Sequence, residues 1–415
     1  MIQNPATFLR TLFDRAVEVA DPMRSLAAFL PEKPKGRLLV IGAGKASARM
    51  AEAVEAAWGP CQGLVITRYG YGRPCKGIEI VEAAHPVPDE AGVNATQRML
   101  DMLAGLTPDD AVLALISGGA SALLCAPSSG MTLAEKQQVN AALLASGAPI
   151  SAMNTVRKHL SRVKGGQLAA AAYPARMLAL MISDVPGDDP AFIGSGPTVG
   201  DATTPEDARA ILDRWRIPVP DAAKAALAAS GVVPPGDRRL SCTENVIYAA
   251  PAQSLAAAAD LAAAACDVRT LGDRLEGEAR DVAREQAAMA ITLAAGMSRG
   301  DRPILLLSGG ELTVTRTGDG VGGPNAEFCL ALALALEGHS QVHAIACDTD
   351  GVDGAAEVAG ALIGPDTLSK APDAVEALAR NDAHSYFARA GAQVVTGPTL
   401  TNVNDFRAIL ILPPG

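Results

Sequence analysis

The stretch RLLVIGAGKASA, residues 37–48, decides the fold of this chain. It begins as a short apolar run, passes through Gly42 and Gly44, and continues into residues that suit a helix. Similar apolar runs alternate with longer Ala-rich segments, at residues 63–67, 111–117, 177–183, 303–308, 342–347 and 408–412. This alternation is typical of βαβ units in a parallel sheet, where ligands bind at the carboxyl ends of the strands. The sequence therefore predicts an α/β protein whose functional residues lie on the turns that follow the strands.

Length and composition set the domain organisation. A chain of 415 residues exceeds what one core usually organises, so two domains are expected. A Pro- and Gly-containing charged stretch at residues 231–242 marks the boundary, which gives domains 1–238 and 239–415. Because only 3% of the residues are aromatic, Ala, Leu and Val must fill both cores.

Charge and cysteine usage exclude several classes of protein. The net charge is -10 and no basic cluster is interleaved with aromatic residues, which argues against nucleic acid as a partner. The first thirty residues predict an amphipathic helix without a signal-peptide core, and no apolar run is long enough for a membrane span. Seven scattered cysteines without a C-x-x-C pair indicate a reducing cytoplasm.

The turn at residues 41–48 (IGAGKASA) is the first candidate site. Its glycines allow backbone N–H groups to approach an anion, and Lys45 adds a positive charge. A phosphate-binding Walker A loop would need Gly in place of Leu39, and the dinucleotide fingerprint would need Gly in place of Ser47. Neither standard loop is therefore present, and both ligand contact and a purely structural turn remain open.

A second turn, SGGAS at residues 117–121, follows the next long apolar run. Gly118 and Gly119 allow a nest of N–H donors, while Ser117 and Ser121 add hydroxyl groups, so that a small anion would fit. The structural alternative is a serine helix cap followed by a tight turn. A serine hydrolase is excluded because the G-x-S-x-G spacing is not met.

Residues 154–166 (NTVRKHLSRVKGG) concentrate positive charge in an acidic protein. At helical spacing Asn154, Arg157, Lys158, Ser161 and Lys164 fall on one face. A solvated helix face is the ordinary explanation of such a run. Its end in Gly-Gly and its closeness in sequence to the SGGAS turn equally favour binding of an anion.

Two acidic loops also follow apolar runs. Residues 183–198 (SDVPGDDPAFIGSGPT) present Asp188 and Asp189, either for magnesium or a general base or as turn formers. Residues 347–354 (CDTDGVDG) present Asp350 and Asp353, which suit magnesium with a nucleotide. The turns SGGE at 308–311 and GGPNAE at 322–327 complete a second set of anion-capable turns.

The ordered motifs resemble the glycerate 2-kinase family, whose C-terminal part is called MOFRL and whose members are also named TtuD-type hydroxypyruvate reductases. The resemblance covers nearly the whole chain and rests on GAGKA, AHPVPDE, SGGASAL, NTVRKHLSRVKGG, SDVPGDD, GSGPT, SGGE, GGPNAEF, DTDGVDG and TNVNDF. It implies a Rossmann-like N-terminal domain, a smaller α/β domain with the MOFRL region at about residues 300–412, and an active site in the cleft between them. The implied reaction is phosphorylation of D-glycerate at its 2-hydroxyl by ATP with Mg²⁺, in a cytoplasmic protein whose partners are small molecules, with a homodimer left open.

Residue roles follow from the motifs and the resemblance together. The catalytic candidates are Lys45, Arg157, Asp188 and Asp189. The substrate or phosphate candidates are Gly42, Gly44, Ser117, Gly118, Gly119, Ser121, Asn154, Lys158, Lys164 and Ser195. The nucleotide candidates are Gly309, Gly310, Glu311, Asn325, Glu327 and Asn402, and the magnesium candidates are Asp350, Asp353 and Glu311.

One position departs from the family pattern. Many members carry Arg in a GGRN motif where this chain has Pro324, so that another cation must take that role or the substrate differs. Two other functions remain open. One is NAD(P)H-dependent reduction of hydroxypyruvate, with Arg68 next to a 2′-phosphate, and the other is a catalytically inactive protein that binds nucleotides or anions.

Overall fold

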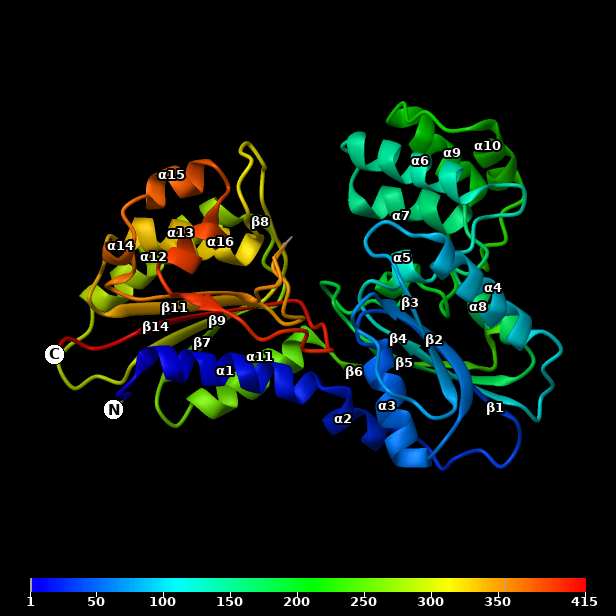
Figure 1. The fold of residues 1–415 in the computed structure, drawn as a ribbon, viewed down its shortest axis with the longest axis horizontal. Helices are drawn as coiled ribbons and strands as arrows, with labels where there is room; N and C mark the ends of the chain where they lie inside the picture. Colours follow the sequence, from blue (N-terminus) through cyan, green and yellow to red (C-terminus); the bar gives the residue numbers. More distant parts are fainter. Residues whose placement is uncertain (1, 355) are drawn as a thin grey trace. The chain divides into compact units, whose positions relative to one another are not determined.

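The computed structural model describes residues 2–354 and 356–415 and divides into two compact units. The first unit comprises residues 22–248, and the second comprises residues 2–21 together with 249–415 (Figure 1). Each unit contains its own sheet with helices packed against it. The predicted α/β fold class is confirmed.

The sheet of the first unit has the strand order β3-β2-β1-β4-β5-β6. The ladders joining β1 to β2, β1 to β4, β2 to β3 and β4 to β5 are all parallel. The strands are β1 (Leu38–Ala43), β2 (Gln62–Arg68), β3 (Ile78–Ala83), β4 (Ala111–Ile116), β5 (Arg176–Ile182) and β6 (Thr243–Ala249). The apolar runs predicted a strand at β1, β2, β4 and β5, because strands covered on both faces read as continuous apolar sequence.

Helices cover both faces of this sheet. Leu39, Ile41 and Ala43 of β1 share a core with residues of α4, α5 and α8, whereas α3 packs against β1, β2 and β4. A separate apolar core joins α6, α7, α9 and α10, which form a helical group of their own (Figure 1). The helices of this unit are α2 (Pro22–Ser25), α3 (Ser47–Trp58), α4 (Glu90–Leu103), α5 (Ala120–Leu123), α6 (Leu133–Ala145), α7 (Ile150–His159), α8 (Gln167–Ala172), α9 (Pro205–Arg214) and α10 (Asp221–Ala228), with 3₁₀ turns η1 (Leu26–Phe29), η2 (Ile193–Ser195) and η3 (Arg238–Leu240).

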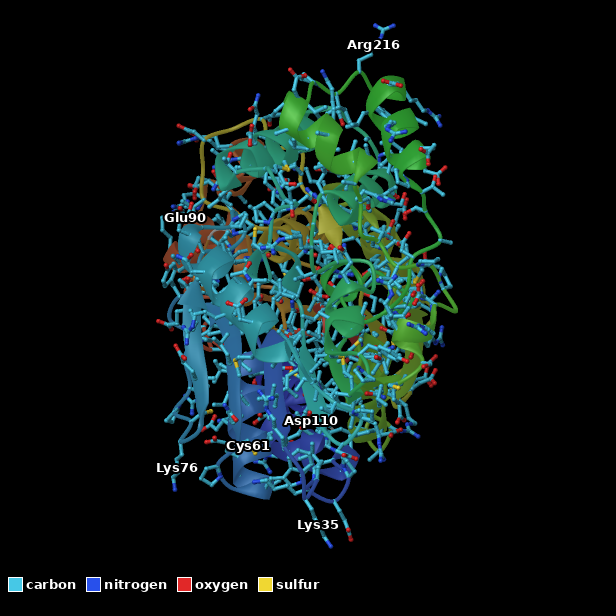
Figure 2. All side chains as sticks on the ribbon, turned by 90° about the vertical axis from the view of Figure 1, so that its right-hand side faces the viewer. Lys35, Cys61, Lys76, Glu90, Asp110 and Arg216 are labelled. Atoms are coloured by element: carbon cyan, nitrogen blue, oxygen red, sulfur yellow. The ribbon has the colours of Figure 1, made fainter. Side chains whose placement is uncertain are left out.

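The amino ends of the strands lie together at one edge of the sheet. Lys35, Cys61, Lys76 and Asp110 precede β1, β2, β3 and β4, and Figure 2 shows them at the lower end of the unit. Glu90, which begins α4 after β3, lies toward the opposite end (Figure 2). The turns that follow β1, β3 and β4 therefore share the upper edge.

The sheet of the second unit is mixed. Its order is β13-β12-β11-β14-β9-β7, with β7 parallel to β9 and the other ladders antiparallel. The strands are β7 (Asp267–Gly272), β9 (Ile304–Ser308), β11 (Val342–Asp348), β12 (Gly360–Ile363), β13 (Gln393–Val394) and β14 (Asp405–Ile411), and β8 (Gly277–Glu278) pairs separately with β10 (Leu312–Thr313). Apolar runs predicted β9, β11 and β14, but not their antiparallel pairing, because a buried strand has the same composition in either direction.

Helices α1 (Pro5–Ala20) and α11 (Pro251–Ala262) cover one face of the mixed sheet (Figure 1). The other face carries α12 (Ala279–Ala295), α13 (Pro324–Leu336), α14 (Thr367–Lys370), α15 (Ala374–Ala379) and α16 (Ala383–Arg389). No helix within residues 2–354 and 356–415 combines the length and apolar character needed to cross a bilayer.

The units differ from the domains 1–238 and 239–415 expected from the sequence. They join between residues 248 and 249, and residues 2–21 belong to the second unit. The cause is the apolar face of α1, since Leu9, Leu12 and Phe13 pack with α11 and with Phe406 of β14. Helix α1 therefore packs on the same sheet as β14, the last strand. Composition along the sequence does not reveal such long-range packing.

Candidate functional site

The two glycine-rich turns of the first unit are hydrogen-bonded to each other. The Lys45 N–H donates to the Gly118 carbonyl at 2.8 Å, and the Ser117 N–H donates to the Ala43 carbonyl at 3.2 Å. The turns follow β1 and β4, which are neighbours in the sheet although two strands separate them in the chain. This reversal of strand order is the point at which open α/β sheets bind ligands.

Ser117 links the turns through its side chain. Its buried hydroxyl accepts the Ala46 N–H at 3.0 Å and lies 3.1 Å from the Ser47 hydroxyl. Helix α3 has no side-chain cap of its own, so Ser117 satisfies a free N–H group at its start. The expected role of Ser117 in binding phosphate is corrected on this point, because its hydroxyl is occupied by the neighbouring turn.

Gly44 is required by this close approach. Its φ of 141° lies in a region that side chains disfavour, and a Cβ there would be only 2.1 Å from the Ser117 Oγ. At Gly42 the backbone conformation is ordinary, but a Cβ would lie 2.4 Å from the Leu115 carbonyl oxygen. Close packing therefore explains why both positions of this turn are glycine, and Lys45 is the residue of the turn that carries a charge.

His85 is a residue of this site that the sequence did not identify. Gly119 has φ 83°, and a Cβ at this position would lie 3.2 Å from both the His85 Nε2 and the Lys45 Cγ. The imidazole of His85 and the side chain of Lys45 thus both approach Gly119 of the SGGAS turn. His85 stood within the AHPVPDE motif after a strand, so its position at the same sheet edge as Lys45 was the available signal.

A third loop joins the SGGAS turn. The Ser121 and Ser195 hydroxyl groups are 2.7 Å apart, and the Lys164 Nζ donates to the Ser121 carbonyl at 2.8 Å. A Cβ at Gly194 would lie 2.9 Å from the Ala120 Cβ, so this loop packs directly on the start of α5. The structure therefore brings together three of the substrate candidates, Ser121, Ser195 and Lys164.

The basic segment does not form the single helical face expected from its spacing. Helix α7 ends at His159, and Ser161 forms an isolated antiparallel bridge with Pro127, so Ser161 and Lys164 lie on a loop. This prediction is wrong because the tertiary pairing ends the helix before the charged pattern finishes. Asn154 and Arg157 remain on α7, with the Arg157 Nη1 3.4 Å from the Asn154 Oδ1.

Lys158 and Lys164 are both buried but differ in their partners. Lys158 forms an ion pair with Asp201 and lies 5.3 Å from the centre of the Phe192 ring, so its charge is neutralised within the protein. Burial is the main cause that lowers the pKa of Lys164 to about 7, and the positive charge of Lys136 contributes to this shift. Lys164 is therefore the more responsive of the two to an incoming anion.

Asp188 and Asp189 lie on the loop after β5. The exposed Asp189 accepts the Ala191 N–H at 2.9 Å, as a turn former does. Asp188 has a φ of 54°, and its Oδ1 is buried without a hydrogen-bond partner in the described part of the chain. Of these two catalytic candidates, Asp188 is the one with a buried oxygen that lacks a hydrogen-bond partner among the described residues.

In the second unit Asp353 caps helix α13. Its Oδ1 accepts the Asn325 N–H at 3.0 Å, its Oδ2 accepts the Ala326 N–H at 2.8 Å, and the His384 Nε2 lies 3.0 Å from the same Oδ2. Pro324 occupies the first turn of this helix, where a missing N–H has no consequence. Both oxygens of the fully buried Asp353 are thus occupied, and its expected role as a magnesium ligand is corrected.

Asn325 connects this cap to a buried ion pair. Its Nδ2 donates to the Asp405 Oδ1 at 2.7 Å, and the Asp405 Oδ2 lies 3.0 Å from the Arg407 Nη1. Burial raises the pKa of Asp405 to about 6, against the opposing effect of Arg407. The Arg407 Nη2 also donates to the carbonyls of Gly309 and Gly310, at 2.5 and 3.1 Å. Asp405, Arg407 and His384 hold the SGGE and GGPNAE turns, and sequence motifs did not reveal these contacts.

The remaining nucleotide and magnesium candidates of the second unit lie in different surroundings from one another. Glu327 is fully buried, where it pairs with Arg280 and accepts from the Asn381 amide, so its role is to stabilise the fold. The buried Asp350 accepts the Val352 N–H at 2.8 Å, and the buried Asn402 accepts the Asn404 N–H at 3.2 Å, whereas Glu311 is exposed. Among residues 2–354 and 356–415, no three His, Cys, Asp or Glu side chains gather as metal ligands. The set of Asp350, Asp353 and Glu311 does not fit a magnesium ion.

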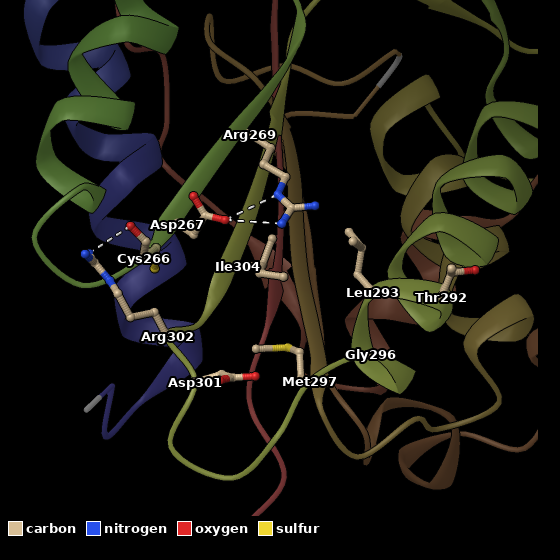
Figure 3. Close-up of a pocket in the computed structure, with 10 residues that line it drawn as sticks. All are labelled: Cys266, Asp267, Arg269, Thr292, Leu293, Gly296, Met297, Asp301, Arg302 and Ile304. Carbon is tan, nitrogen blue, oxygen red and sulfur yellow. Dashed lines mark hydrogen bonds and ion pairs between the residues drawn. The ribbon is translucent and has the colours of Figure 1, made fainter.

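A cavity of about 560 Å³ lies elsewhere in the second unit, between β7 and the end of α12 (Figure 3). Its polar groups pair with one another, since Arg269 contacts Asp267 and Arg302 donates to the Cys266 carbonyl (Figure 3). None of the predicted site residues lines it. The glycine turns of each unit, considered separately, remain the candidate sites.

The two units and the glycine-rich turns at the switch point of the first sheet define a two-unit α/β protein with a candidate anion site on its first sheet. Residues 8–228 match a domain of unknown function, DUF4147, and residues 304–405 match the MOFRL family. The chain belongs to the glycerate 2-kinase family with a C-terminal MOFRL region, as its motifs predicted.

Individual relatives carry two kinds of name. A protein of Agrobacterium vitis, named a hydroxypyruvate reductase, is 51% identical over 97% of this chain and 94% of its own. The D-glycerate 2-kinase of Thermotoga maritima is 36% identical, covering 96% of both chains. The crystal structure of a Thermotoga maritima glycerate kinase matches with a TM-score of 0.88 at 35% identity, covering 98% of this chain and 99% of that one.

Proposed function

We propose that this protein is an ATP-dependent kinase that phosphorylates D-glycerate at the 2-hydroxyl group. The observation that carries the proposal is the position of Lys45 at the switch point, beside His85 and against the SGGAS turn. The fold shared with a glycerate kinase of Thermotoga maritima supports it further.

Phosphoryl transfer requires positioning and neutralised charge more than covalent chemistry. Lys45 and the N–H groups of Gly118 and Gly119 bind the transferred phosphoryl group, and the Ser121 hydroxyl orients the acceptor. The Asp188 carboxylate, whose buried Oδ1 has no hydrogen-bond partner within residues 2–354 and 356–415, accepts the proton of the attacking hydroxyl. None of these roles requires a residue to form a covalent bond with the substrate.

The second unit binds ATP in this proposal. Arg407 holds the SGGE turn through the carbonyls of Gly309 and Gly310, and the last residue of this turn, Glu311, is exposed. Mg²⁺ accompanies the nucleotide, and no protein side chain is assigned to it because Asp353 is occupied by α13.

Reduction of hydroxypyruvate is the second candidate, and the name of the Agrobacterium vitis relative favours it. Two features of the region where a dinucleotide would bind argue against the reductase activity. Ser47 replaces the third glycine, and its hydroxyl donates to the Leu115 carbonyl at 2.9 Å. The guanidinium of Arg68 lies 5.2 Å from the centre of the Tyr71 ring. A parallel assay decides between the candidates, because the kinase releases ADP with D-glycerate and the reductase oxidises NAD(P)H with hydroxypyruvate.

The contact of His85 with the SGGAS turn leads to a first prediction. His85→Asn removes the imidazole Nε2 next to Lys45, and we expect kcat/KM for D-glycerate to fall roughly 10- to 100-fold. Steady-state kinetics with ADP release as the signal measure this change, and His339→Asn in the second unit serves as the control. Unchanged kinetics of the His85 variant would remove His85 from the site.

A further inference from the structure

Two buried lysines and one half-buried arginine of the first unit have no carboxylate partner among the residues that the structure describes. The Lys136 and Lys164 side chains are 4% and 2% exposed, and their Nζ atoms donate to the carbonyls of Leu160 and Ser121, each at 2.8 Å. The half-buried Arg157 has its Nη1 3.4 Å from the Asn154 Oδ1. In the part of the chain that the structure describes, none of these three cations forms an ion pair with Asp or Glu.

The three cations gather around the end of α7, since Arg157 lies in its last turn, Lys136 donates to the carbonyl of the following Leu160, and Lys164 is on the loop just beyond. Burial is the main cause that lowers the pKa of Lys136, Lys164 and Arg157, and the charge of Arg157 lowers that of both lysines as well. The other groups that act on Lys164 are Cys125 after α5 and Lys158 on α7. Lys158 differs from the cluster because Asp201 neutralises it.

Such an arrangement is unfavourable for folding alone. A buried ammonium group loses its hydration, and one carbonyl partner uses only one of its three N–H donors. Replacing buried charges with apolar groups of similar volume is often neutral or stabilising, so a cluster of this kind does not serve the stability of the fold. Unfavourable groups of this type gather at functional sites.

We infer that Lys136, Lys164 and Arg157 form an oxyanion subsite that binds the carboxylate of the acceptor substrate, with Lys136 as a further substrate-binding residue. Lys164 connects the subsite to the SGGAS turn through the Ser121 carbonyl, at the same switch point as Lys45. The identity of the ligand rests on the proposed function, and the existence of the subsite rests on the burial of the cations.

The variants Lys136→Met and Lys164→Met test the inference, because Met keeps the length of the side chain and removes its charge. We expect each to weaken D-glycerate binding at least tenfold by calorimetry, without lowering the urea midpoint of the unliganded protein. Binding of glycerol, which lacks the carboxylate, should be unchanged. Lys224→Met on α10 is the control, since Lys224 is exposed and pairs only with Asp221.

The opposite pattern would overturn the inference. If the lysines serve only to bind the Leu160 and Ser121 carbonyls, both variants lose stability and retain glycerate affinity. If the variants lose ADP binding but still bind D-glycerate, the subsite holds an oxyanion of the nucleotide. This result would also overturn the assignment to the acceptor substrate. Should the wild type not bind D-glycerate, the proposed function fails, and inorganic phosphate becomes the probe. Phosphate binding that both variants lose then supports the subsite, and its absence in the wild type refutes it.

The pH dependence gives an independent readout. Burial and the charges of Lys136 and Arg157 hold the pKa of Lys164 at about 7. The lysine is therefore charged below this pH and neutral above it, so D-glycerate affinity should fall from pH 6.5 to 8.5, by at most about tenfold per pH unit. The carboxylate stays ionised throughout this range. Lys164→Met should show a flat profile, and a parallel decline in both proteins would contradict the inference.

Discussion

Replacing Lys45 with alanine should abolish most of the activity while leaving the fold intact. We expect kcat/KM to fall by about 10³-fold, equivalent to about 4 kcal/mol of transition-state stabilisation, because a positioned cation next to a transferring phosphoryl group has this effect. The fold should persist, since the contact that joins the two turns is made by the backbone N–H of Lys45 to the Gly118 carbonyl. Steady-state kinetics and thermal unfolding of the same preparation measure both quantities.

Lys35→Ala is the matched control for this experiment. Lys35 is an exposed lysine of the same unit, located before β1 at the opposite end of the strand from Lys45 (Figure 2). Its removal should leave kcat/KM unchanged. Lys45→Arg should recover only part of the activity, because a planar guanidinium does not occupy the position of a compact ammonium group. Near-normal turnover of Lys45→Ala would exclude Lys45 from catalysis, and loss of its folded signal would make its role structural.

Replacing Asp353 with alanine should have the largest effect on stability. The change removes the acceptor of the Asn325 and Ala326 N–H groups and the partner of His384, all of them buried. Uncompensated buried donors and the loss of a helix cap together predict a decrease of about 3–5 kcal/mol in the free energy of unfolding. Urea unfolding in the presence of EDTA measures the difference. Asp353→Asn keeps one acceptor oxygen and should give an intermediate decrease.

The same variants separate a helix cap from a magnesium ligand. Asp319→Ala is the control, since Asp319 is an exposed carboxylate that pairs with Arg380 at the surface, and its variant should match the wild type. As a cap, Asp353 supports the fold without any metal, so Mg²⁺ should not restore the stability of the alanine variant. A variant that is stable in EDTA but needs more Mg²⁺ for turnover would return Asp353 to the metal site.

Local sequence determined the elements and the turns of this protein. The run at residues 37–48 gave β1, its turn and α3, because apolar strands and glycine turns are specified by adjacent residues. The positions of Lys45 and of the SGGAS turn on loops after apolar strands were also readable from the sequence, and both loops follow strands of one parallel sheet. The order of the motifs identified the family, and the comparisons confirmed it.

Only the tertiary structure decided which polar groups are available to a ligand. Ser117, Asp353 and Glu327 read as binding residues in the sequence, yet each is buried and hydrogen-bonded to a distant segment. The burial of Lys136 without an acidic partner was equally invisible in the sequence. The physical reason is that a buried polar group must find partners wherever the fold provides them. The chemical character of a side chain is known from its residue type, whereas its hydrogen-bond partners and its loss of hydration depend on distant residues. The partners are 28 positions apart for Asn325 and Asp353 and 71 positions apart for Ala46 and Ser117.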